Sequence, residues 1–407
     1  MTIDTIDTKT KSSSTWQLFM YLIMIGYIFI AMPKNDTTYL VARSVQVIES
    51  IFFISLIFKY FQQGINFNRF NNYTNSWWLF YTILTYTFAS GMGLTPLFKW
   101  LNVIIFLLLE RCYWQNDFKQ SLYYIATTFS VLIYLNGLLL IIYPEGLWID
   151  EEWVGRGDAT RYLFGNYNQM GFVGLIGITT QAMYTLFTGK GKFNLFLIII
   201  ISIASVIFVG SMTSTVGLSV LALYIMLHKI LKRPNVFLTV FVIIYVLFFV
   251  VIVWGGSSVD QIQFLATFVE DILTKDTTFS NRTEIWSNAV SLIEKKPWLG
   301  YGIQDVEWND DHLGGSGPHN LWLMFLLQGG IVLLGSFLYI VIQVIKHAAK
   351  TVQPSTTIGI VSIFTLFMMS LFETYNIIQI FFLLQLTYHS SLLVTQQPDK
   401  EPLLQES

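Results

Sequence analysis

Residues 194–231 read NLFLIIIISIASVIFVGSMTSTVGLSVLALYIMLHKIL, two apolar runs separated by a short polar stretch. Each run approaches the roughly 20 residues that a helix needs to cross the ~30 Å hydrocarbon core of a bilayer. Similar runs recur along the chain of 407 residues, of which 54% are hydrophobic and 12% charged. A soluble globular domain carries roughly twice that charged fraction. The sequence therefore predicts an all-α integral membrane protein.

We expect about twelve membrane-spanning helices. The expected spans are 16–32, 39–58, 76–95, 96–110, 121–143, 168–187, 194–212, 214–231, 235–254, 320–345, 355–372 and 375–396. If the N-terminus is cytoplasmic, 14 of the 23 lysines and arginines fall in cytoplasmic connections and tails. This positive-inside bias predicts a multi-pass protein of the cytoplasmic membrane with both termini in the cytoplasm. The net charge of −2 lacks the basic surplus that a nucleic-acid partner requires.

These spans divide the chain into four regions. Residues 1–254 form an N-terminal bundle of about nine helices with an outer loop at 144–167, and residues 255–319 form a large extracytoplasmic loop before the tenth span. Residues 320–396 form the C-terminal membrane helices, and 397–407 form a cytoplasmic tail. The large loop is far longer than a connection needs to be, and such loops are usually functional. Its hydrophobic pattern predicts two amphipathic helices, one at 259–274 and one that Asn281 caps and Pro297 ends.

The second amphipathic helix would place Arg282 in its first turn. A cation is mildly unfavourable there, whereas an anion bound by the guanidinium and the free N–H groups would reverse the sign. Arg282 is therefore a candidate diphosphate ligand, since its guanidinium group can donate hydrogen bonds to two oxygens at once. The alternative is an ordinary ion pair with a nearby Asp or Glu.

His319 follows Pro318, a residue that suits the first turn of a helix. The helix dipole at that position would disfavour the protonated ring and leave a neutral imidazole, which a general base requires. Asp310, Asp311 and His312 could bind a metal, but neighbouring acids in a loop usually face water, so we expect no metal site.

The stretch from Asn281 to Gly335 resembles the C-terminal region of the O-antigen ligase and Wzy-type polysaccharide polymerase family. The matching residues are Arg282, Trp286, Pro297, Leu299, Gly300, Gly302, His319, Asn320 and Gly330. The upstream segment 161–168, RYLFGNYN, is similar to the family's Gly-x-x-Asn entry into a central membrane helix. Relatives often have a Ser-Arg pair near the outer end of a central helix, whereas residues 210–215 read GSMTST. Arg161 and Arg156 of the outer loop are the candidates for the place of that arginine.

The resemblance implies a glycosyltransferase of GT-C-like architecture that acts on undecaprenyl-diphosphate-linked glycans without a cofactor. His319 would be the base that deprotonates the acceptor hydroxyl, and Arg282 would stabilise the departing diphosphate. The residues expected to contact the substrate are Arg161, Arg156, Asn168, Ser214, Thr215, Asn320 and His312.

Three functions stay open. A polymerase would join lipid-linked repeat units on the outer face of the membrane, with donor and acceptor both undecaprenyl-diphosphate-linked, beside a chain-length regulator and a flippase of the same pathway. A ligase would pass the finished glycan to another acceptor. A transporter would instead place ionisable residues in mid-membrane, where Arg43, Glu49 and Lys99 are the candidates. The charge pattern favours an outer-face site, and the composition favours the polymerase.

Overall fold

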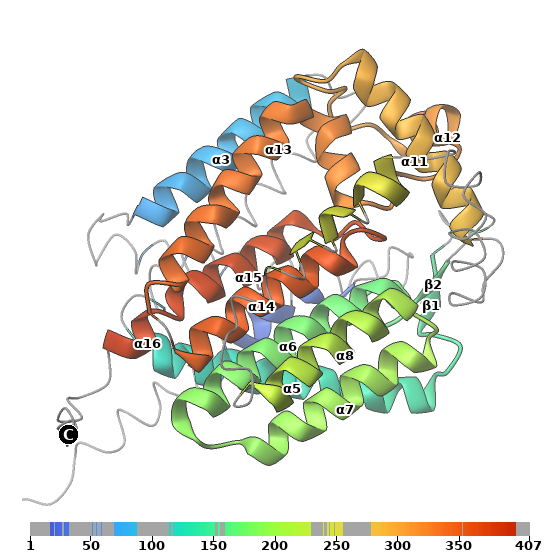
Figure 1. Ribbon diagram of the computed structural model, residues 1–407. Helices are drawn as coiled ribbons and strands as arrows, with labels where there is room; N and C mark the ends of the chain where they lie inside the picture. Colours follow the sequence, from blue (N-terminus) through green and yellow to red (C-terminus); the bar gives the residue numbers. More distant parts are fainter. Residues whose placement is uncertain are drawn as a thin grey trace, which may run out of the picture.

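The computed structural model describes residues 117–150, 159–228, 278–351 and 353–395, residues 69–87, most of 17–31 and of 242–254, and positions 51, 54, 58, 114, 154 and 239. It is a bundle of helices with one small two-stranded sheet (Figure 1). The elements are α3 (Arg69–Thr87), α5 (Phe118–Ile142), β1 (Trp148–Ile149), β2 (Thr160–Arg161), α6 (Tyr167–Thr188), α7 (Lys192–Phe208), α8 (Met212–Leu227), η3 (Phe249–Trp254), α11 (Thr278–Lys295), α12 (Val306–Leu313), α13 (Leu321–Ala348), α14 (Pro354–Met369), α15 (Ile377–His389) and α16 (Leu392–Thr395).

Three helices in the described part of the chain, α5, α6 and α13, are long and apolar enough to cross a membrane, and α7, α8, α14 and α15 are apolar but shorter. This architecture agrees with the expected all-α membrane class. The number of twelve spans stays a prediction, because the expected spans 39–58 and 96–110 lie largely outside the described residues, as does the expected helix 259–274. Residues 144–167, the expected outer loop, contain the strands β1 and β2, which the sequence did not predict.

Helix α6 lies at the centre of the lower bundle, where it packs against α5, α7, α8 and α14 (Figure 1). Glycines on α6 allow these close approaches. A Cβ atom on Gly171 would lie 2.0 Å from Ser214 Oγ on α8, and one on Gly177 would lie 2.3 Å from Ile133 on α5. Small residues of this kind let membrane helices approach closely, since lipid supplies no hydrophobic force between them. The helix contacts therefore fix where the N-terminal ends of α6 and α8 meet.

Helix α13 is broken at Gly330, whose backbone has φ 63° and ψ −163°. The break frees the carbonyls of the preceding turn from their usual partners. A loop that follows α11 satisfies them, because Tyr301 N–H donates to the Leu327 carbonyl at 2.7 Å and Gly302 N–H donates to the Gln328 carbonyl at 3.0 Å. Buried backbone groups must find hydrogen-bond partners inside the protein, and this loop provides them.

The same loop also binds the helix beyond the break. The N–H of Ile331 donates to the Pro297 carbonyl at 2.8 Å. Only glycine fits at the two points of contact: a Cβ on Gly300 would lie 2.4 Å from the Leu327 carbonyl oxygen, and one on Gly330 would lie 2.2 Å from the Trp298 carbonyl group. The segment 297–303 and the broken turn of α13 therefore form one interlocked backbone unit.

Candidate functional site

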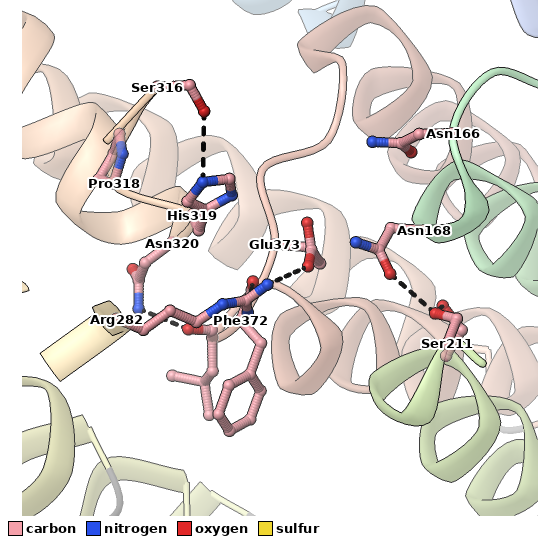
Figure 2. Close-up of polar contacts among 12 residues, drawn as sticks. Asn166, Asn168, Ser211, Arg282, Ser316, Pro318, His319, Asn320, Phe372 and Glu373 are labelled. Carbon is pink, nitrogen blue, oxygen red and sulfur yellow. Dashed lines mark hydrogen bonds and ion pairs between the residues drawn. The ribbon is translucent and has the colours of Figure 1, made fainter. Parts of the chain in front are cut away.

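Several helix ends that are distant in the sequence meet at one end of the bundle. Leu321 N–H, at the start of α13, donates to the Ser370 carbonyl after α14 at 3.0 Å. The Ser211 hydroxyl, just before α8, donates to Asn168 in the first turn of α6 at 2.8 Å. Phe172 on α6 packs its ring at 5.0 Å from that of Tyr375, just before α15. The connection 370–376 therefore lies between the starts of α6, α8 and α13, and Figure 2 shows side chains from these elements facing one another.

His319 occupies a strained backbone position in the loop before α13. Its φ of 45° is the only positive value of a non-glycine residue among the residues that the structure describes. Such conformations cost on the order of 1–3 kcal/mol and are found mainly at functional sites. The helix begins after it, because Asn320 is the N-cap and accepts from the N–H groups of Trp322 and Leu323. The prediction that Pro318 lies in the first turn of α13 is therefore wrong, and both Pro318 and His319 precede the helix.

The His319 ring is neutral near pH 7. Burial, and after it the positive charge of Arg282, lowers its pKa to about 4. The lowered pKa agrees with the predicted neutral imidazole, but its cause is burial and the nearby Arg282 charge rather than the helix dipole. The Ser316 hydroxyl lies 3.5 Å from His319 Nε2 (Figure 2). An imidazole that holds no proton on one ring nitrogen can accept one from a substrate hydroxyl.

Arg282 forms a buried ion pair with Glu373, a partner that the sequence does not identify. Its Nη2 lies 2.8 Å from Glu373 Oε1, its Nη1 donates to the Phe372 carbonyl, and the two charged side chains are only 18% and 8% exposed. The expected place of Arg282 at the helix N-terminus is wrong, because α11 begins at Thr278 and continues through Asn281. The alternative ion pair is the one observed.

Glu373 is not among the predicted site residues, because it falls between the expected spans 355–372 and 375–396, and charged residues are common in such connections. The signal was present: an acid flanked closely by apolar helices at a membrane boundary is costly unless it has a partner. In the structure Glu373 is 6% exposed and lies between Arg282 and Asn168 (Figure 2).

Asn168, Ser211 and Ser214 form a chain of hydrogen bonds between α6 and α8. Ser211 Oγ lies 2.8 Å from Asn168 Oδ1 and 2.8 Å from Ser214 Oγ. Thr215 lies one residue further and donates to the Ser211 carbonyl at 2.8 Å. The structure thus brings the predicted residues Asn168 and Ser214 together, and it adds Ser211.

Asn320 is likewise held at the site. Its Nδ2 donates to the Leu371 carbonyl at 2.8 Å, while its Oδ1 caps α13. Since both ends of this buried amide are used by the protein, Asn320 holds the loop of His319 against the connection 370–376.

The other predicted residues lie elsewhere. Arg161 in β2 pairs with Asp150 at 3.2 Å, because the strand register places these two segments side by side. Arg156 lies outside the described residues. His312 stacks on Trp308 with ring centroids 4.3 Å apart, and its Nδ1 lies 2.9 Å from the Trp308 carbonyl, so both contacts stay within α12. In the part of the chain that the structure describes, no three His, Cys, Asp or Glu residues gather in a way that could hold a metal ion.

Comparison with known proteins supports the expected family. Residues 197–338, which include Arg282 and His319, match the family model described as O-Antigen ligase. Two relatives described as "Putative polysaccharide ligase" are 26% identical over 241 residues (Rickettsia typhi) and 28% identical over 243 residues (Rickettsia prowazekii). Each match covers 54% of this chain and 58% of the relative, so the chain spans a little over half of their length. The resemblance to the O-antigen ligase family is thereby confirmed.

Proposed function

Because residues 197–338 match the O-antigen ligase family and Arg282 and His319 meet at one end of the bundle, we propose that this protein is a glycosyltransferase acting on lipid-diphosphate-linked glycans. The single observation that supports this most strongly is the meeting of a neutral imidazole and a buried arginine from separate elements. The match with polysaccharide ligases supports an enzyme of this general kind. The more specific proposal is a polymerase that joins undecaprenyl-diphosphate-linked repeat units on the extracytoplasmic face of the cytoplasmic membrane.

In the proposed step, the acceptor oxygen displaces the lipid diphosphate from the donor sugar. His319 takes the proton of an acceptor hydroxyl, the oxygen forms a bond to the anomeric carbon of the donor, and the bond from that carbon to the diphosphate breaks. The electron pair leaves on the diphosphate, where Arg282 stabilises the developing charge. A guanidinium has five N–H donors, and the contacts with Glu373 and Phe372 engage only two of its nitrogens, so donors are left for an oxyanion.

Glu373 acts in this proposal as a positioning residue. It fixes the guanidinium through a charge-assisted hydrogen bond of 2.8 Å. Without substrate the pair is neutral overall, so the site does not bury an uncompensated charge. A diphosphate brings negative charge to the guanidinium from another direction.

A ligase that passes a finished glycan to a different acceptor is the second candidate, and the descriptions of the relatives favour it. It would use the same base and the same arginine, so the site geometry supports both equally. The transporter alternative depended on Arg43, Glu49 and Lys99, which lie outside the described residues. The expected chain-length regulator and flippase remain predictions.

Product analysis separates these proposals. Purified wild type, His319→Ala and the control His228→Ala are incubated with the lipid-linked oligosaccharide extracted from cells that lack this protein, and the products are resolved on a gel. His228 lies at the opposite end of α8 from Ser211, so its replacement should leave the products unchanged. A ladder that only His319→Ala abolishes supports the polymerase. Transfer only to an added second acceptor supports the ligase, and full activity of His319→Ala would refute the role of the base.

A further inference from the structure

Four buried polar side chains without formal charge lie next to the ion pair. We refer to Asn168, Ser211, Ser214 and Tyr375 as the neutral polar cluster; each is at most 6% exposed. They come from α6, α8 and the connection before α15. Glu373, two residues before Tyr375, forms the ion pair with Arg282.

The hydrogen bonds within this cluster leave some of its donors unused. Asn168 Oδ1 can only accept, so Ser211 donates its one proton to it and must accept from Ser214. The Tyr375 hydroxyl lies near Ser214 and interacts weakly with it, but no described residue gives this hydroxyl a hydrogen bond of good geometry. Burial, and after it the charge of Glu373, raises the pKa of this phenol, so it keeps its proton and remains a donor. The amide nitrogen of Asn168 points toward Glu373 (Figure 2).

A buried donor without a well-formed hydrogen bond is unfavourable, and an oxygen atom of a bound ligand would supply the acceptor that the Tyr375 hydroxyl lacks. The surroundings are shaped around the cluster. Gly171 leaves the space in which Ser214 lies, since a Cβ there would come within 2.2 Å of the serine Cβ. Phe172 packs against the Tyr375 ring with an interplanar angle of 31° and holds the phenol in place.

The site therefore has two chemically different halves. Arg282, which Glu373 holds in place, can form charge-assisted hydrogen bonds to a diphosphate, and His319 lies beside it. The neutral polar cluster offers uncharged donors and acceptors, which suit the hydroxyl groups of a sugar ring, and buried polar groups of this kind reject ligands that leave them unpaired. On the basis of the proposed function, we infer that the neutral polar cluster binds the sugar that is joined to the lipid diphosphate, with the Tyr375 hydroxyl as a donor to a sugar oxygen.

Two lipids test this division of labour. The full-length protein in detergent is titrated with undecaprenyl diphosphate, which has no sugar, and with the lipid-linked oligosaccharide extracted from cells lacking this protein. Tyr375→Phe should weaken binding of the sugar-bearing lipid by about 3–10-fold, the effect expected for one lost neutral hydrogen bond, and leave undecaprenyl diphosphate within about twofold of wild type. Ser214→Ala should show the same pattern, and it provides a second test if Tyr375→Phe folds poorly.

Tyr81→Phe is the matched control. Tyr81 is also a buried tyrosine, but its hydroxyl lies 3.3 Å from Gln328 on α13, far from the cluster in sequence and in another helix pair, so its replacement should change neither affinity. Equal loss for both lipids, or no loss for either, in Tyr375→Phe and Ser214→Ala would overturn the inference. Arg282→Gln tests the proposed function separately: unchanged binding of undecaprenyl diphosphate would refute the diphosphate role of Arg282, while the comparison for Tyr375 would still decide where the sugar binds.

Discussion

Replacement of Gly330 by alanine should destabilise the whole protein, although the change adds a single methyl group. The backbone at φ 63° and ψ −163° is open essentially only to glycine, so alanine there costs roughly 1–3 kcal/mol. The added Cβ would also lie 2.2 Å from the Trp298 carbonyl group, so the loop 297–303 must move. Loss of two of the backbone hydrogen bonds that join loop and helix adds about 1–3 kcal/mol. We therefore expect a total of about 2–6 kcal/mol.

The assay is the temperature at which half of the detergent-solubilised protein is lost from the monodisperse peak in size-exclusion chromatography. Gly335→Ala is the control, because it lies on the same helix, five residues further on, and an added Cβ meets nothing within 4 Å. It should be neutral or slightly stabilising, since alanine favours the helix. Equal melting temperatures for Gly330→Ala and wild type would refute the interlocked arrangement of loop and helix.

Two further predictions concern the charged half of the site. Glu373→Gln should lower the melting temperature, because it leaves a buried guanidinium without its charged partner, which costs about 3–5 kcal/mol of stability. The double variant Arg282→Gln/Glu373→Gln should recover part of this loss. A Glu373→Gln variant as stable as wild type would contradict a stabilising ion pair. If His319 is the base, the single-turnover transfer rate should stay level as the pH falls from about 8 to about 5 and should decline only below that, because the pKa of the ring is about 4. A decline centred near pH 6.5, the ordinary pKa of histidine, would contradict the burial of the ring.

The sequence predicts the positions of several apolar helices in the described part of the chain, because hydropathy is a local property of the chain. The expected spans 168–187 and 194–212 differ by only a few residues from Tyr167–Thr188 and Lys192–Phe208. The break at Gly330 was not predicted, although Gly330 is one of the residues that carry the family resemblance. What stabilises it is a loop some thirty residues away, and no local pattern shows that contact.

The candidate site shows the same division. His319 and Asn320 could be predicted as site residues because this polar pair directly precedes an apolar helix. Glu373 could have been suspected from its place between two apolar helices, but its pairing with Arg282 could not be predicted, because the two residues are about ninety positions apart. Arg161 was expected near the substrate, but the pairing of β1 with β2 gives it a local acid, Asp150. Pairing over long distances, rather than residue type, decides which charges meet.

The interlocked loop and broken helix also limit how parts of relatives can be exchanged. The contacts between residues 297–303 and the turn around Gly330 are made by main-chain atoms, so neighbouring side chains are free to vary while the two glycines are not. A chimera that takes residues 297–303 from one relative and α13 from another would join two backbone segments that do not fit each other. The exchangeable module therefore extends from Pro297 past Ile331, and a productive junction lies outside it.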